Sequence, residues 1–90
     1  MSSDIQVYGA DWCGLTYSLR EYLTNARFAY DFHDVDRDAD ACELLLAITD
    51  GRRRFPVVVV QERVLHNPSR DELVRVLDET GSDDRRRTDR

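Results

Sequence analysis

The pattern of hydrophobic and polar positions predicts alternating strands and helices in the first part of the chain. Polar and apolar residues alternate over residues 4–8 and stop at Gly9, as in a short strand. From residue 15 onward the apolar positions recur with helical spacing, so a helix beginning at or just after Cys13 directs one face toward a core. Those positions are Leu15, Leu19, Tyr22, Leu23 and Ala26. Alternation of aromatic residues over residues 28–35 then predicts a second strand.

A second helix is predicted over about residues 38–49, followed by a buried strand. Asp36, Asp38 and Asp40 lie around the helix start, where the positive end of the helix dipole favours anions, so they need no catalytic role. Asp50-Gly51 supplies a stop signal. The apolar run over residues 55–60 is typical of a central strand covered on both faces.

The chain then predicts a hairpin and a last helix. Residues 61–63 form a candidate turn, and residues 64–66 a short partner strand. Ser69 and Glu72 have the spacing of a capping box at the start of the last helix. Its buried face is predicted to consist of Leu73, Val76 and Leu77, and Gly81 is its expected stop.

The predicted order β-α-β-α-β-β-α indicates an α/β fold with a four-stranded mixed sheet flanked by helices on both faces. Strands joined by helical crossovers are expected to be parallel, and the closing hairpin antiparallel. We expect one domain over residues 1–81. Residues 82–90 contain no apolar side chain to bury, so they predict a disordered polar tail.

Composition limits the functions that this fold can serve. A chain of 90 residues has room for one domain. Its 13 basic residues, all arginine, are outnumbered by 18 acidic residues, a balance that does not suit nucleic-acid binding. No apolar run approaches the roughly 18–20 residues that span a bilayer, so we expect a cytoplasmic protein without membrane contact. Two cysteines in different contexts favour reduced thiols over a disulfide scaffold.

Cys13 is the sharpest candidate for chemistry, because it lies between the carboxyl end of a strand and the amino end of a helix. Unpaired backbone N–H groups of the first helical turn point toward such a position. Together with the helix dipole they stabilise a thiolate and lower the pKa below the roughly 8.5 of a free thiol. A thiolate is the nucleophile that attacks disulfides. The sequence therefore predicts a redox-active or nucleophilic cysteine at residue 13.

Three segments together resemble the glutaredoxin family of the thioredoxin fold. They are Trp12-Cys13-Gly14-Leu15-Thr16 after the first strand, Phe55-Pro56 before the valine-rich strand, and Asn67-Pro68-Ser69 before the last helix. Within this family the chain looks most like the mycoredoxins, whose last helix is likewise preceded by Asn-Pro-Ser. The resemblance covers about residues 4–80. It implies reduction of mixed disulfides linked to glutathione or mycothiol, and a monomeric cytoplasmic protein.

The motif departs from the dithiol members of the family at its fourth position, which is Thr16 instead of cysteine. An intramolecular disulfide within Cys-Gly-Leu-Thr is therefore impossible, and the monothiol route is the expected one. In that route Cys13 attacks the mixed disulfide between a protein and a small thiol, takes up the small thiol and is freed by a second small thiol. The Thr16 hydroxyl either donates to the thiolate or bonds to its own helix backbone.

The resemblance also implies the residues that bind the small thiol. Pro56 matches the family's cis proline, and the residue before it, Phe55, is expected to pair its backbone with the cysteinyl amide of the bound thiol. Arg54 either pairs with a carboxylate or is solvated. Asn67 and Ser69 either hold the polar end of the thiol or only cap the last helix. Trp12 is expected beside Cys13 as a wall of the groove or as core, and Tyr8 and Tyr17 either line the groove or merely pack.

Two other classes of function remain open from the sequence. Monothiol relatives with Cys-Gly-Phe-Ser bind an iron–sulfur cluster together with glutathione, but this chain lacks their lysine before the cysteine and has Leu15-Thr16 in place of Phe-Ser. A thioredoxin-fold interaction domain without redox activity is the other alternative. Cys42 lies among apolar helix positions, where a small hydrophobe needs no chemistry. Cys13, Cys42, His33 and His66 lack the paired spacing of zinc ligands, so no metal is expected.

Overall fold

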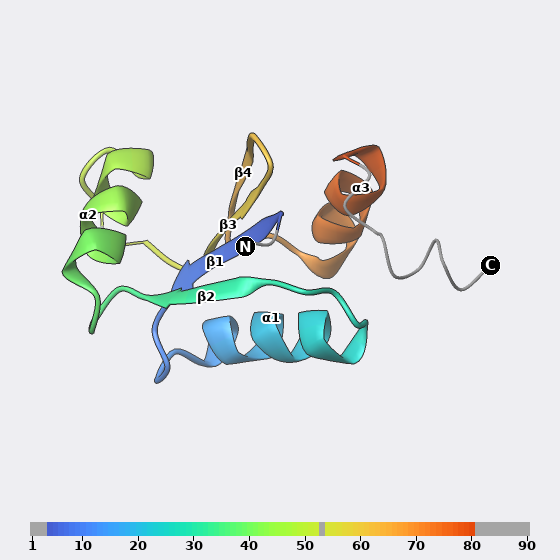
Figure 1. Ribbon diagram of the computed structural model, residues 1–90, viewed down its shortest axis with the longest axis horizontal. Coiled ribbons are helices and arrows are strands. Elements are labelled where there is room, and N and C mark those ends of the chain that lie inside the picture. The colour runs from blue at the N-terminus through green and yellow to red at the C-terminus, as the bar shows by residue number, and fades with distance from the viewer. Residues whose placement is uncertain (1–3, 53, 81–90) are drawn as a thin grey trace.

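The computed structural model describes residues 4–52 and 54–80, which consist of a four-stranded sheet and three helices (Figure 1). The predicted element order is confirmed. In chain order the elements are β1 (Ile5–Gly9), α1 (Gly14–Asn25), β2 (Asp31–Asp34), α2 (Ala39–Ile48), β3 (Val57–Val60), β4 (Arg63–His66) and α3 (Arg70–Thr80). The predicted stop at Gly81 and the predicted tail over residues 82–90 lie outside the described residues.

The sheet has the strand order β2-β1-β3-β4, and β3 is a central strand as predicted. β1 and β2 are parallel, with Val7 opposite Phe32, while β3 and β4 form the expected antiparallel hairpin. The expectation that strands joined by a helical crossover are parallel is wrong for the crossover through α2. The strand that follows it, β3, runs antiparallel to β1, with Tyr8 opposite Val57. β3 therefore begins at the end of the sheet where β1 finishes.

The antiparallel direction of β3 decides where the candidate site residues meet. β1 ends at Gly9, β3 begins at Val57 and β4 ends at His66, and the register places all three at the same end of the sheet. The segments that follow or precede them therefore converge: residues 10–13, residues 54–56 and residues 67–69. A parallel β3 would have placed Pro56 at the opposite end of the sheet from Cys13.

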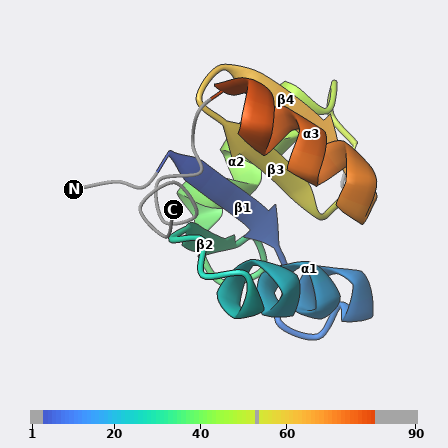
Figure 2. The ribbon, with the colours of Figure 1, turned by 90° about the vertical axis from the view of Figure 1, so that its right-hand side faces the viewer.

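Helices cover both faces of the sheet, as the sequence predicts (Figure 2). α1 and α3 pack on the face that carries the larger core cluster, and α2 packs on the other. The larger cluster contains Ile5, Val7, Leu19, Leu23, Phe28, Val58, Val60, Leu65, Leu73, Val76 and Leu77. The smaller contains Tyr8, Val35, Ala41, Leu45 and Val57. The predicted buried face of the last helix is confirmed.

The buried face of α1 differs from the predicted one at its first turn. Leu19 and Leu23 are buried as expected, but Leu15 is 56% exposed and Thr16 is fully buried. Helical spacing allows either residue 15 or residue 16 to continue the stripe of Leu19 and Leu23, because both lie three or four residues before Leu19. Packing against β1 selects Thr16, and Leu15 is left free to contribute to the surface of the site.

β2 is shorter than the predicted strand over residues 28–35. The pairing with β1 begins only at Gln6 opposite Asp31. Phe28 is buried in the larger cluster and receives its backbone bond from helix α1, where its N–H donates to the Leu23 carbonyl. Phe28 therefore fits the alternating pattern because it packs in the core, although it lies before the strand begins.

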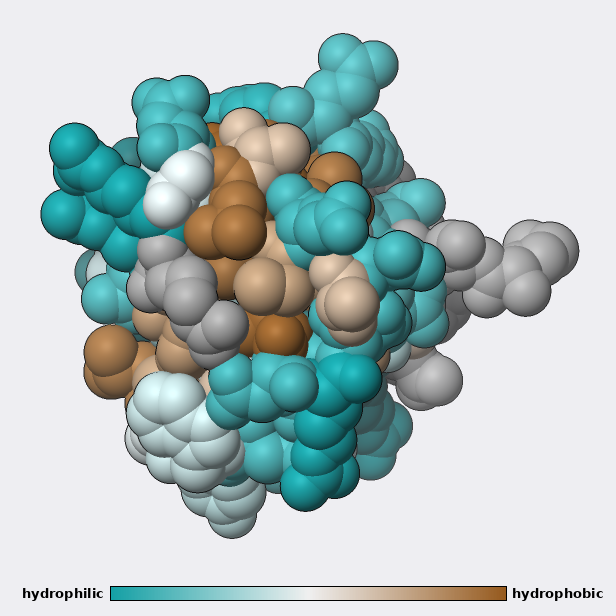
Figure 3. Space-filling model, turned by 90° about the vertical axis from the view of Figure 1, so that its left-hand side faces the viewer, coloured by the Kyte–Doolittle hydropathy of each residue, from teal (hydrophilic) through white to brown (hydrophobic). Residues whose placement is uncertain are grey.

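The start of α3 confirms the predicted cap, and the start of α2 shows a further one. The Asp38 side chain accepts hydrogen bonds from the N–H groups of Asp40 and Ala41, and the Ser69 hydroxyl oxygen accepts one from the N–H of Glu72. α2 is apolar beyond its buried stripe, since Leu44 is 46% exposed. The side of the molecule on which α2 lies shows apolar surface bordered by hydrophilic side chains (Figure 3). Among the described residues, no helix has the length and apolar character that crossing a membrane requires.

Candidate active site

Cys13 lies at the N-cap of α1, as predicted. Residues 10–13 form a tight turn closed by the Cys13 N–H, which donates to the Ala10 carbonyl at 3.1 Å. The Cys13 backbone is extended, and its carbonyl accepts the first bond of the helix from the Tyr17 N–H at 2.9 Å. The side chain is half-buried and free of any disulfide. The thiol is therefore reachable from solvent and faces the N–H groups that the first turn leaves unpaired.

The pKa of the Cys13 thiol is lowered from its ordinary value. Partial burial by itself raises this pKa, but the backbone N–H of Thr16, the hydroxyl of Thr16 and the backbone N–H of Leu15 together lower it by more. The Cys13 side chain makes no regular capping hydrogen bond to these donors. A thiolate attracts nearby donors more strongly than a neutral thiol does, which is why they lower the pKa.

Thr16 is held in place by Gly9 at the end of β1. A Cβ atom added to Gly9 would lie 2.5 Å from the Thr16 hydroxyl oxygen and 2.6 Å from its methyl carbon. The threonine side chain thus rests directly on the glycine backbone. Its hydroxyl is buried and has no hydrogen-bond partner of regular geometry within residues 4–52 and 54–80. Of the two sequence alternatives, donation to the helix backbone is therefore absent, and the hydroxyl remains available to a Cys13 thiolate.

Thr16→Val is expected to raise the Cys13 pKa without destabilising the fold. Valine has the same shape but no hydroxyl, so it removes one of the donors that favour the thiolate. It also removes a buried polar group without a partner, so the free energy of unfolding should stay the same or rise by up to about 1 kcal/mol. The pH dependence of Cys13 alkylation, together with denaturant unfolding, measures both quantities.

Thr16→Ser is the control for this substitution, because it keeps the hydroxyl and loses only the methyl group. Its alkylation profile should stay close to that of the wild type, while Thr16→Val shifts to higher pH. An unshifted profile for Thr16→Val would show that the hydroxyl does not act on the thiol.

The Phe55-Pro56 peptide bond is cis, as the family resemblance implies. Residues on both sides of Cys13 lie near this segment. The Trp12 ring packs edge-on against Phe55 with ring centroids 5.7 Å apart, and Leu15 lines the same groove as Pro56. Cys13 therefore lies in a turn that faces the cis proline.

Two grooves meet at Pro56 and Asn67. The first, which we call the interhelical groove, has a volume of about 170 Å³ between α1 and α3, and the second continues on the other side of Pro56. The interhelical groove is lined by Leu15, Ser18, Leu19, Tyr22, Pro56, Asn67, Pro68, Arg70 and Leu73. The second is lined by Arg54, Phe55, Pro56, Val57, His66 and Asn67. Cys13 itself lines neither groove; the interhelical groove is mainly apolar with Arg70 in its lining, and Arg54 belongs to the second groove.

Of the two binding residues predicted before the last helix, Asn67 lines both grooves, whereas Ser69 lines neither. Asn67 has a left-handed backbone with φ of +46°, and its N–H donates to the Pro56 carbonyl at 2.8 Å, which ties the two segments together. The Ser69 hydroxyl oxygen caps α3, which is the second of the two roles that the sequence allowed. Because a hydroxyl accepts and donates at once, the Ser69 O–H still offers a donor. Arg54 is exposed and forms no ion pair among the described residues, which agrees with the solvated alternative.

The aromatic candidates take three different positions. Trp12 is not core, because its side chain is 69% exposed, and its indole N–H donates to the Asp36 carboxylate. Tyr17 is exposed on α1. Tyr8 is buried in the smaller cluster, where burial raises its pKa and its ring stacks on His33 with centroids 4.7 Å apart. Tyr8 thus packs in the core instead of lining either groove.

The remaining cysteine and histidines are dispersed. Cys42 is half-buried on α2 and packs against the smaller cluster, on the opposite face of the sheet from α1. His33 bonds through Nε2 to the Gln6 side chain at 2.6 Å, and His66 ends β4. Within the part of the chain that the structure describes, no three side chains of histidine, cysteine, aspartate or glutamate gather as metal ligands.

Sequence reasoning missed the charged residues that surround the Cys13 turn. Asp11 pairs with Arg20 of α1 at 3.3 Å and with Arg37 of the segment between β2 and α2 at 3.5 Å. Arg37 also lies 3.8 Å from the Asp34 carboxylate. No spacing in the sequence predicts these pairs, because the Cys13 turn, α1 and the segment after β2 are brought together only by the fold.

Comparison with protein families and known proteins agrees with this geometry. Residues 5–65 match the family model described as glutaredoxin. A Mycobacterium tuberculosis protein named as a glutaredoxin is 32% identical over 74 residues, which cover 81% of this chain and 88% of the relative. Mycoredoxin 1 of Corynebacterium glutamicum is 38% identical over 56 residues, covering 62% of this chain and 68% of the relative.

Solved structures share the fold. The crystal structure of a thioredoxin-like protein superposes with a TM-score of 0.73 at 30% identity and covers 81% of this chain and 99% of that one. A glutaredoxin from Archaeoglobus fulgidus superposes with a TM-score of 0.71 at 15% identity, covering 83% of this chain and 86% of that one, which shows the fold alone.

Proposed function

Because the chain belongs to the glutaredoxin family of thiol–disulfide oxidoreductases, we propose that it reduces mixed disulfides between proteins and a low-molecular-weight thiol by a monothiol route. Cys13 is the nucleophile. The observation that carries the proposal is the half-buried Cys13 thiol at a helix N-cap, with a lowered pKa, in a turn that faces cis Pro56.

The route consists of two thiol–disulfide exchanges. The Cys13 thiolate attacks the sulfur of the small thiol in the mixed disulfide, a new bond joins Cys13 to the small thiol, and the protein substrate leaves as a thiolate that takes up a proton. The thiolate of a second small thiol then attacks the small-thiol sulfur of this adduct. Cys13 is released as a thiolate, and the two small thiols leave as their disulfide. The second small thiol is therefore the reductant.

The monothiol form is supported by the surroundings of residue 16 and by the position of the second cysteine. The family's dithiol members carry a second thiol where this chain has Thr16, which is buried against Gly9 and whose hydroxyl helps to lower the Cys13 pKa. Cys42 belongs to the helix on the other face of the sheet. We infer that Cys13 completes each cycle without a resolving thiol from its own chain.

The small thiol is proposed to lie along Pro56 with its cysteinyl amide paired to the Phe55 backbone. Leu15 and Pro68 offer it apolar contact in the interhelical groove. Asn67 and the Ser69 hydroxyl are proposed to hold its polar end, with Arg54 at the edge and Trp12 as an exposed wall. Mycothiol is the first candidate, because mycoredoxin 1 is among the relatives and the chain carries Asn67-Pro68-Ser69; glutathione is the alternative.

The proposal is tested by the mass of the protein after it reacts with an oxidised small thiol. The reduced chain is treated separately with mycothiol disulfide and with glutathione disulfide, and the intact mass is recorded before and after digestion. We expect a single adduct of one small thiol located on Cys13. Turnover of peptide–mycothiol and peptide–glutathione mixed disulfides, followed in parallel, identifies the preferred thiol.

Other products would contradict the proposal in distinct ways. A loss of two hydrogens, with Cys13 and Cys42 joined in one peptide pair, would show an intramolecular disulfide and a dithiol cycle. No adduct and no turnover with either thiol would favour a redox-inactive interaction domain, or a cluster-binding module if reconstitution with iron and sulfide gave a coloured dimer.

A further inference from the structure

The turn that carries Cys13 is surrounded by carboxylates. Asp11 lies within the turn, Asp34 ends β2, and Asp36 lies in the segment between β2 and α2, which contacts the turn through Asp11 and Trp12. Only Trp12 lies between Asp11 and Cys13 in the chain, so the Cα atoms of Asp11 and Cys13 are at most about 7 Å apart. Uncompensated carboxylates at this range oppose a thiolate, because like charges destabilise one another.

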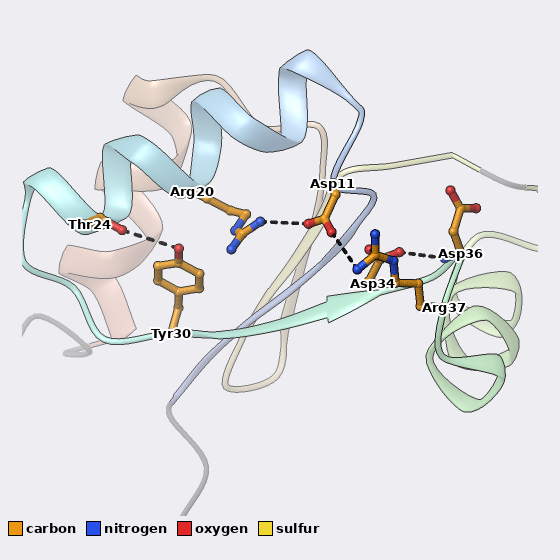
Figure 4. Close-up of polar contacts among 7 residues, drawn as sticks. All are labelled: Asp11, Arg20, Thr24, Tyr30, Asp34, Asp36 and Arg37. Carbon is orange, nitrogen blue, oxygen red and sulfur yellow. Dashed lines mark hydrogen bonds and ion pairs between the residues drawn. The ribbon is translucent and has the colours of Figure 1, made fainter.

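Two arginines from different elements neutralise Asp11 and Asp34. Arg20 reaches from α1 to one oxygen of Asp11, and Arg37 reaches from the segment after β2 to the other (Figure 4). Arg37 also bridges to Asp34, so four side chains form one group of zero net charge. We call Asp11, Arg20, Asp34 and Arg37 the charge clamp.

Packing holds the two least exposed members of the charge clamp, Arg20 and Asp34, in place. The Arg20 guanidinium carbon lies 3.8 Å from the centre of the Phe32 ring, and its side chain is only 34% exposed. The Asp34 side chain is 13% exposed, whereas the Arg37 side chain is 77% exposed. Arg37 is thus the most exposed member of the charge clamp. Because exposed ion pairs contribute only about 0–1 kcal/mol to folding, a contribution to stability does not explain why Arg37 pairs with Asp11 and Asp34.

We propose that the charge clamp is a positioning device of the Cys13 turn, in which Arg20 and Arg37 anchor Asp11 and cancel the carboxylate charge that would otherwise oppose the Cys13 thiolate. The inference rests on the proposed function in that it assigns these residues to the reactivity of the same nucleophile. They act through Cys13 and need not touch the substrate.

Other charged groups at this end of the molecule stay outside the clamp. On α1, Glu21 accepts from the Tyr17 hydroxyl at 3.5 Å. Asp36 is engaged by the Trp12 indole. Arg54 and His66 line the groove beyond Pro56 and form no ion pair with the clamp among the described residues. Substitutions inside the clamp therefore change one balanced group and leave these neighbours in place.

The direction in which each substitution shifts the Cys13 pKa distinguishes an electrostatic effect of the clamp from mere anchoring of the turn. Asp11→Asn leaves Arg20 and Arg37 with excess positive charge, so the Cys13 pKa should fall by about half a unit. Arg20→Gln and Arg37→Gln leave carboxylate charge uncompensated, so the pKa should rise, by about half a unit for Arg20 and less for the more exposed Arg37. Half a unit changes the thiolate fraction about threefold at a pH well below the pKa.

The measurement is the rate of Cys13 alkylation by iodoacetamide from pH 4 to 10, resolved by mass spectrometry of the Cys13 peptide so that Cys42 does not contribute. The double variant Asp11→Asn/Arg20→Gln should return close to the wild-type profile. Arg63→Gln is the matched control, because Arg63 pairs with Glu79 at 3.0 Å, is half-exposed and lies at the other end of the sheet. Its profile should be unchanged.

If the four residues only anchored the turn, every single variant would loosen it, and the pKa would rise in all three. A rise in Asp11→Asn, or an unshifted profile in all variants, would overturn the proposal. Alkylation needs neither the small thiol nor turnover. The clamp is thus judged separately from the oxidoreductase function, which the adduct on the wild-type chain decides.

Discussion

Cys13→Ser is expected to reduce the turnover of protein–mycothiol and protein–glutathione mixed disulfides at least about a thousandfold. Serine keeps the position at the N-cap of α1 but has no sulfur with which to form the adduct, and its hydroxyl does not ionise near neutral pH. The fold should persist, because serine is a favoured N-cap residue. Steady-state turnover measured with each mixed disulfide, beside the far-ultraviolet circular dichroism of the variant, checks both expectations.

Cys42→Ser is the matched control and should keep turnover within about a factor of two. Cys42 packs against the smaller cluster on the α2 side of the sheet, away from the two grooves that meet at Pro56. Residual turnover in Cys13→Ser that disappears in the double variant would place chemistry on Cys42 and refute the monothiol assignment.

Gly9→Ala is expected to destabilise the fold by about 1–3 kcal/mol and to slow Cys13 chemistry as well. The added methyl group would lie 2.5 Å from the Thr16 hydroxyl oxygen, and Thr16 is fully buried, so the first turn of α1 must move. That turn carries the donors that lower the Cys13 pKa. Denaturant unfolding measures the stability, and the pH profile of Cys13 alkylation should shift upward.

A compensating substitution distinguishes this contact from a general effect at Gly9. Thr16→Ala removes the two atoms nearest to the added methyl group, so the double variant Gly9→Ala/Thr16→Ala should lose less stability than the sum of the single variants. Additive losses would mean that the destabilisation does not arise from contact between the two residues. Gly14→Ala is a control, since a Cβ there would meet no atom within 4 Å.

The sequence predicted the elements well where hydrophobic spacing and capping residues agree. Ser69, Asp38 and the valine run each act through local geometry, and each lies in the structure as expected. The spacing did not separate Leu15 from Thr16, because both positions continue the same helical stripe. The close approach of the Gly9 backbone decided between them, and that approach depends on how α1 packs against β1.

The sequence by itself determined the element order, the position of Cys13 at a helix start and, from three short motifs, the resemblance to glutaredoxins. Those properties follow from local backbone preferences and residue types. Only the tertiary structure decided that β3 runs antiparallel to β1, which brings Pro56 and Asn67 to the Cys13 turn. It alone joined Asp11 to Arg20 and Arg37. The physical reason is that strand direction and ion pairing between elements depend on how distant segments pack, which no spacing along the chain encodes.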